Sequence, residues 1–221
     1  MTIVDWHRAF KVQLDTLDTQ SALRLQPEVV DVFFNKAINK IMMEIYDAYE
    51  ESQEYSDALS SQTVINNNLT VTATGYPNQW KVSLPLDYYH HLQSYATLSI
   101  GNATGVVRTV KQLLDTENKV LGNPFERADD TEVPIFFKDG GIYVYTPPGY
   151  TLNSFSVTYL KNPKQVSYKQ YVANGSVPGG IGDTDIDEYL HERIINLAVI
   201  YALETYGSER TAPKVQIKDV T

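Results

Sequence analysis

The sequence predicts an α+β fold: N-terminal helices and a buried C-terminal helix packed with an antiparallel β-sheet or partial barrel of six or seven strands. Two helical patterns occupy residues 3–59, and a third, almost wholly apolar one occupies 185–207. Between residues 64 and 160 the apolar side chains recur with a period of two, which is typical of strands. Helices and strands segregated along the chain in this way favour the α+β class.

The 221 residues, 43% of them apolar, are enough for a substantial core, and we expect one domain. Within it we distinguish five parts by their patterns. They are a helical N-terminal part (1–60), a β-rich body (64–160), an extended arm (161–184), a core helix (185–207) and a tail (208–221).

The first two helices follow from apolar spacing. One is predicted from Ile3 to about Leu17, and Pro27, which suits a first helical turn, opens a long one that runs to about Leu59. The apolar residues of the first helix that share a face are Ile3, Trp6, Phe10, Leu14 and Leu17.

The β-rich body is predicted from alternation and turn residues. The predicted hairpins pair residues 69–73 with 80–84, 95–100 with 106–114 and 133–138 with 142–145, and residues 155–160 form a further strand. Residues 87–92 have the pattern of one or two helical turns, and 115–130 are predicted to be irregular or weakly helical.

Only Asn196 interrupts the apolar wall of the predicted core helix, so we expect this helix to be buried nearly all round and to pack against the long N-terminal one, with the sheet completing the cover. Thr184 or Asp185 is expected to cap it, and Gly207 to end it. The apolar run spans roughly 15 Å at ~1.5 Å per residue, half the ~30 Å of a bilayer core. We therefore predict a core helix and no membrane partner.

Composition excludes several classes of function. The chain has no cysteine, which rules out disulfides, thiolate nucleophiles and thiolate metal sites. A net charge of −9 argues against a protein that wraps nucleic acid, because phosphate contacts need a basic surface, but it allows one that surrounds DNA without gripping it. The 16 tyrosines suit strands and partner surfaces.

Three candidate chemical sites have simpler explanations. Glu188 and His191 share a helical face, but a carboxylate-bridged di-iron site needs a second such pair. His90 and His91 are adjacent in the sequence, so on a helix their side chains point in different directions. Asp183, Asp185 and Asp187 resemble the start of a calcium loop, yet lack its glycine, so helix capping is preferred. The glycine-rich stretch 175–182 lacks the Lys-Ser/Thr of a P-loop, and acids crowd the helix start after it. We expect no metal, no cofactor and no enzymatic activity.

Five stretches, in this order, resemble structural proteins of crAss-like, Bacteroidetes-infecting tailed bacteriophages. They are Leu84-Pro85-Leu86-Asp87-Tyr88-Tyr89-His90-His91-Leu92, Val120-Leu121-Gly122-Asn123-Pro124-Phe125, Ile142-Tyr143-Val144-Tyr145-Thr146-Pro147, Tyr159-Leu160-Lys161-Asn162-Pro163 and Glu188-Tyr189-Leu190-His191-Glu192-Arg193-Ile194-Ile195. The resemblance covers the last two thirds of the chain. It implies a neck ring, or head-to-tail connector, located in the virion and in the host cytoplasm during assembly. Such rings are typically dodecameric, contact the portal and neighbouring neck or tail proteins, and meet DNA only in transit.

A closed ring needs two different contact patches on each subunit. We assign these to the arm and the tail. The candidate interface residues are Tyr168, Tyr171, Val177, Pro178, Ile181, Val215 and Ile217. The alternative is another virion accessory, or a module that binds host surfaces or glycans, which an exposed Trp80 beside a pocket would favour.

Overall fold

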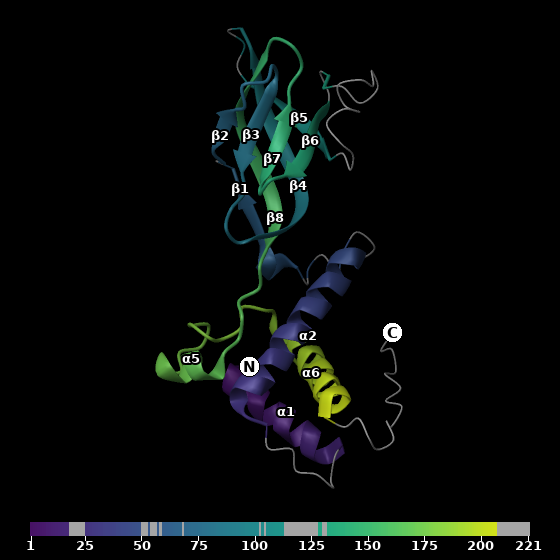
Figure 1. Ribbon diagram of the computed structural model, residues 1–221, viewed down its shortest axis with the longest axis vertical. Helices are drawn as coiled ribbons and strands as arrows, with labels where there is room; N and C mark the ends of the chain where they lie inside the picture. The colour runs from purple at the N-terminus through teal and green to yellow at the C-terminus, as the bar shows by residue number, and fades with distance from the viewer. Residues whose placement is uncertain are drawn as a thin grey trace. The chain divides into compact units, whose positions relative to one another are not determined.

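The computed structural model describes residues 1–17, 25–49, 53, 57, 59–67, 69–101, 103, 105–112, 128–129 and 132–206, and of 17 and 106–112 it describes the backbone alone. The chain forms two compact units, a helical unit of Met1–Gln62 with Pro163–Thr221 and a sheet unit of Thr63–Asn162 (Figure 1). The sheet unit is thus one contiguous insertion in the helical unit. That a single domain forms, with the sheet covering the C-terminal helix, stays a prediction.

Helices α1, α2 and α6 form the centre of the helical unit. Helix α1 (Ile3–Leu17) has the predicted bounds, and α2 (Pro27–Ala48) begins at the predicted proline. The predicted extension of α2 toward Leu59 lies largely outside the described residues. Helix α6 (His191–Tyr206) follows a 3₁₀ turn, η2 (Glu188–Leu190), and packs against α1 and α2, which confirms the predicted pairing of the C-terminal helix with the long N-terminal one.

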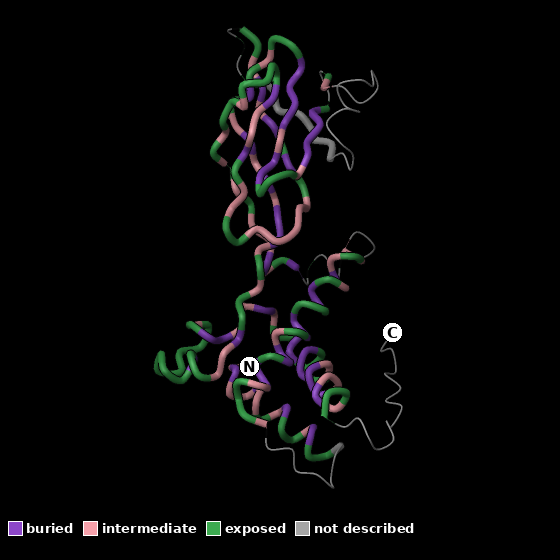
Figure 2. Tube along the Cα trace, in the orientation of Figure 1, coloured by how far each residue is buried: buried purple, intermediate pink, exposed green. Residues whose placement is uncertain are grey.

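Helix α6 is buried on one face rather than nearly all round. Its buried residues recur at helical spacing: His191, Ile194, Ile195, Ala198, Val199 and Ala202. The apolar side chains Leu197, Ile200 and Leu203 lie off this face and are only partly buried, and Asn196 is exposed (Figure 2). Two neighbouring helices cover one stripe of a third, so apolar composition alone overstated its burial.

Aromatic rings fill the centre of the helical unit. Phe34 of α2 is fully buried, and its ring makes edge-on contacts with the rings of Trp6 and Phe10, at centroid distances of 5.3 and 5.6 Å. Trp6 also contacts His191 of α6 at 4.8 Å. One aromatic cluster therefore joins all three helices.

The sheet unit contains eight described strands, one or two more than predicted. They are β1 (Thr63–Asn66), β2 (Val71–Ala73), β3 (Gln79–Ser83), β4 (Tyr88–Ile100), β5 (Val106–Gln112), β6 (Glu132–Lys138), β7 (Gly141–Tyr145) and β8 (Tyr150–Lys161). Their order is β1-β8-β4-β5-β6-β7-β3-β2. The edge strands β1 and β2 are not paired with each other in the described residues, so the barrel is not closed.

The α+β class is confirmed, and so are the three predicted hairpins, β2–β3, β4–β5 and β6–β7. The last turns through Asp139 and Gly140, whose φ values of 49° and 66° suit the type I′ turn that this pair favours. One pairing departs from the antiparallel prediction, because β5 and β6 run parallel.

Of residues 87–92, predicted as helical turns, 88–92 instead form the start of β4, and Asp87 lies in the turn before it. Two register shifts against β8 lie here, between Tyr88 and His90 and between His91 and Gln93. Such bulges break the in–out alternation of a strand, and every side chain from 88 to 92 is partly buried. The period of two was therefore not visible in the sequence at this point.

Truncating the central ring tests this account of the helical unit. Phe34→Ala should destabilise the helical unit by about 3–5 kcal/mol, since it removes a fully buried ring and leaves a cavity. Chemical denaturation followed by circular dichroism at helical wavelengths measures this loss. Val32→Ala, at a position that is 63% exposed on the same helix, is the control and should change stability by less than about 0.5 kcal/mol. Equal losses in the two variants would contradict the assignment.

Candidate interaction surface

The segment predicted as an extended arm is folded. From here on we use the name arm for residues 163–183, the part of that segment at which the chain re-enters the helical unit. It contains helix α5 (Tyr168–Ala173), which Ser167 caps by accepting a hydrogen bond from the Gln170 N–H. Helix α5 contacts α1 and α2, so the arm belongs to the helical unit rather than reaching freely away from it.

Two side chains one turn apart on α2 hold the start of the arm. The buried carboxylate of Asp31 accepts hydrogen bonds from His7 Nε2 at 2.8 Å and from the Tyr168 N–H at 3.0 Å. Asn35 pairs with the backbone of Val166, accepting from its N–H at 2.9 Å and donating to its carbonyl at 3.1 Å. The backbone entering α5 is thus fixed to α2.

A second buried carboxylate holds the end of the arm. Asp183, 3% exposed, accepts from the Ile3 N–H at 2.9 Å and from the Gly179 N–H at 2.8 Å. Ile3 opens α1, so Asp183 caps a helix other than the one predicted. Thr2 and Asp5 complete that cap, and the hydrogen bond from the Thr2 backbone holds the pKa of Asp5 below its usual value.

The arm also braces itself internally. Tyr171, 2% exposed, donates through its hydroxyl to the Ser176 carbonyl, and the Ser176 N–H donates back to the Tyr171 carbonyl. The Ser167 N–H donates to the Gly182 carbonyl at 2.8 Å. Gly182 has a φ of +85°, and a Cβ there would lie 2.5 Å from the Ser167 carbonyl oxygen, so only glycine fits.

These anchors present an apolar surface to solvent. Val172, Val177 and Ile181 are 47, 58 and 64% exposed, and Pro178 is also exposed. We call these four residues the arm tip. No Asp, Glu, Lys or Arg occurs from residue 170 to 182. Exposed apolar groups that cluster on a well-held backbone are typical of a docking surface.

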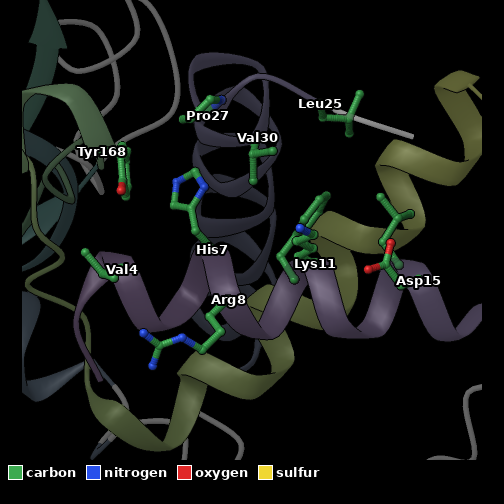
Figure 3. Close-up of a pocket in the computed structure, with 11 residues that line it drawn as sticks. Val4, His7, Arg8, Lys11, Asp15, Leu25, Pro27, Val30 and Tyr168 are labelled. Carbon is green, nitrogen blue, oxygen red and sulfur yellow. The ribbon is translucent and has the colours of Figure 1, made fainter. Parts of the chain in front are cut away.

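A groove of about 570 Å³ lies along α1 in the same unit (Figure 3). Its lining residues come from α1, the start of α2 and the first residue of α5; they are Val4, His7, Arg8, Phe10, Lys11, Leu14, Asp15, Leu25, Pro27, Val30 and Tyr168. We call this the α1 groove. Arg8, Lys11 and Asp15 of α1 supply its charged lining. Phe10, Leu14 and Val30 are 2–4% exposed, so its accessible apolar lining comes mainly from Val4, Leu25 and Pro27.

The predicted interface residues therefore separate into three groups. Val177, Pro178 and Ile181 lie exposed in the arm tip, whereas Tyr171 is a buried anchor and Tyr168 lines the α1 groove. Val215 and Ile217, with the whole predicted tail, lie outside the described residues.

The residues that position the arm were not predicted from the sequence. Asp31 and Asn35 carry one usable signal, since they are polar residues beside the apolar face of α2. Their partners lie more than 130 residues away in the chain, at Val166 and Tyr168. No local pattern identifies such partners.

The remaining candidate sites are accounted for by local contacts. Glu188 lies 3.0 Å from the Met1 α-amino group and is exposed, whereas His191 points inward and donates through Nε2 to the Ile186 carbonyl at 2.9 Å. Asp185 accepts from the Lys164 N–H at 3.1 Å. Within the described ranges, no cluster of three or more potential metal ligands is found.

Trp80 does not have the environment that would favour glycan binding. Its ring is partly buried against the core of the sheet unit, and its Nε1 donates to Thr146 Oγ1 at 3.3 Å. This is the environment of a structural tryptophan.

No helix in the described part of the chain is long and apolar enough to cross a membrane. A scan against models of known protein families gives no match for this chain. A search of curated proteins likewise finds no significant relative.

Gly182→Ala should separate the end of the arm from the start of α5. Gly179→Ala is the matched control, because Gly179 also has a positive φ, +70°, but a Cβ there meets nothing within 4 Å. The control should lose only about 1–2 kcal/mol of unfolding free energy, the cost of a side chain at positive φ. Gly182→Ala should lose more, because its Cβ also meets the Ser167 carbonyl oxygen. Thermal unfolding measures both, and trypsin cleavage at the exposed Lys169 should accelerate in Gly182→Ala alone. Equal behaviour of the two variants would show that the close approach does not matter.

His191 should make the helical unit sensitive to acid. Burial lowers the pKa of its imidazole, and its Nδ1 atom has no partner in the described structure. The unfolded chain then binds a proton near pH 6.5 while the folded one does not. Stability should therefore fall as the pH drops below about 6.5 and level off only below the folded pKa.

The variant His191→Gln tests this dependence, because its amide can still donate to the Ile186 carbonyl but does not titrate. Denaturation at a series of pH values from 7.5 to 5 should give a shallower loss of unfolding free energy in the variant. Parallel curves would mean that the acid sensitivity comes from other groups.

Proposed function

We propose that the protein is a structural virion protein that forms a ring in the phage neck, between portal and tail, as a channel for DNA. The observation that carries this proposal is the arm tip. It is an uncharged apolar surface that buried anchors hold in place, and it is exposed to solvent in the single chain. A surface of this kind is suited to burial against a protein partner.

Ring closure supports the same function. A ring repeats one heterologous contact, which needs two different patches on each subunit. The arm tip and the α1 groove are two such patches in one compact unit. The resemblance to neck proteins of crAss-like phages supplies the dodecameric symmetry, the portal as neighbour and the virion as location.

The acidic balance suits a channel. A net charge of −9 disfavours lasting contacts with phosphate groups, so DNA would pass through the lumen without being held. Filter binding at physiological salt should show no strong DNA affinity. Tight binding to duplex DNA would contradict a passive channel.

Assembly state is the direct test of the proposal. Native mass spectrometry and electron microscopy should be carried out on the purified protein, alone and then mixed with the portal complex of its phage. We expect closed rings, formed alone or only on the portal, because the subunit carries two complementary patches. A chain that stays monomeric and leaves the portal unchanged would refute the connector function.

A further inference from the structure

We infer that the arm tip of one copy docks in the α1 groove of the next copy. This contact rests on the proposed ring function and specifies which two surfaces form its repeated interface. It assigns different roles to the arm, which inserts, and to α1, which receives.

The first argument is the rigidity of the arm tip. Asp31, Asn35 and Asp183 fix the backbone on both sides of it through four hydrogen bonds of 2.8–3.1 Å to arm residues. Binding through a segment that is already ordered loses little conformational entropy. The exposed valine and isoleucine side chains are therefore presented in a fixed arrangement.

The second argument is charge. Two copies of a chain with net charge −9 repel each other unless their contact surfaces avoid acidic groups. The arm tip lies in a stretch without Asp, Glu, Lys or Arg, so it brings no like charge. The α1 groove is lined by the cations Arg8 and Lys11 against the single acid Asp15. It is thus a surface of this acidic chain that another copy can approach without repulsion.

The third argument is the match in chemistry. A groove of about 570 Å³ falls in the roughly 300–1,000 Å³ range of sites that bury compact apolar groups. Phe10, Leu14 and Val30 are only 2–4% exposed. The accessible apolar lining that suits the Val177 and Ile181 side chains therefore comes from Val4, Leu25 and Pro27, while Arg8 and Lys11 remain at the border.

The two surfaces are also mechanically connected within one subunit. Asp31 holds His7 of the groove and the Tyr168 N–H that begins α5, and the His7 and Tyr168 rings lie 4.9 Å apart. The groove wall and the base of the arm therefore share one anchor. A copy that receives an arm tip has its own arm held by the same residues.

Engineered disulfides test the contact, because the chain contains no cysteine of its own. One full-length variant carries Val177→Cys, and a second, size-tagged variant carries Lys11→Cys. The two are mixed, assembled alone or on the portal, and oxidised. The expected result is a mixed disulfide that forms when assembled rings are oxidised and does not form when the mixture is diluted to monomers before oxidation.

The control replaces the second variant by Val32→Cys, which is 63% exposed on α2 and outside the groove. It should give little mixed product. Rings that form but give no more Val177–Lys11 disulfide than the control would overturn the docking contact and leave the ring function standing. Absence of rings under every condition would overturn both.

A charge variant gives an independent measurement. Val177→Lys should weaken association of copies by about a hundredfold, because it brings a further positive charge to the groove that Arg8 and Lys11 line. Val12→Lys, at a position 61% exposed on α1 that does not line the groove, should assemble as the unmodified chain does. Equal assembly of the two variants, by sedimentation or mass photometry, would overturn the inference.

Discussion

The arrangement of the helical unit depends on two buried carboxylates. A carboxylate removed from water needs donors, and Asp31 and Asp183 find theirs on the arm and on α1. Each therefore connects segments that are distant in sequence. The aromatic cluster around Phe34 joins α1, α2 and α6, but it does not dictate where the arm lies. The carboxylates do so, because breaking either set of bonds leaves a buried charge unsatisfied.

An arm held in this way differs in kind from a flexible loop. Its apolar tip stays in water although the residues on either side are anchored, and nothing in the described unit covers it. In a monomer that arrangement has no stabilising role, since exposed valine and isoleucine contribute nothing to the core. Burial of this exposed surface against another chain would explain the arrangement, and this is the basis of the connector hypothesis.

The sequence predicted most of the fold but only part of the surface. Helix α1, the start of α2 and the three hairpins were predictable, because apolar spacing and turn residues such as Asp139 and Gly140 act locally. The start of β4 was not, since bulges remove its alternation. Val177 and Ile181 were predicted as contact residues from an apolar, glycine-rich stretch and are exposed, whereas the role of Asp183 depends on Ile3, 180 residues away.

That separation has a consequence for how the chain acquires its structure during synthesis. The sheet unit is contiguous from Thr63 to Asn162, so it is complete before the residues that cap α1 and pack between α1 and α2 leave the ribosome. The first two helices must remain without α6 throughout that interval, with the apolar faces of both uncovered. Long-range closure of this kind is slow relative to local folding. The inserted unit can therefore fold while the surrounding one is still open, and in such a stage the uncovered faces of α1 and α2 would be the surfaces available to a chaperone.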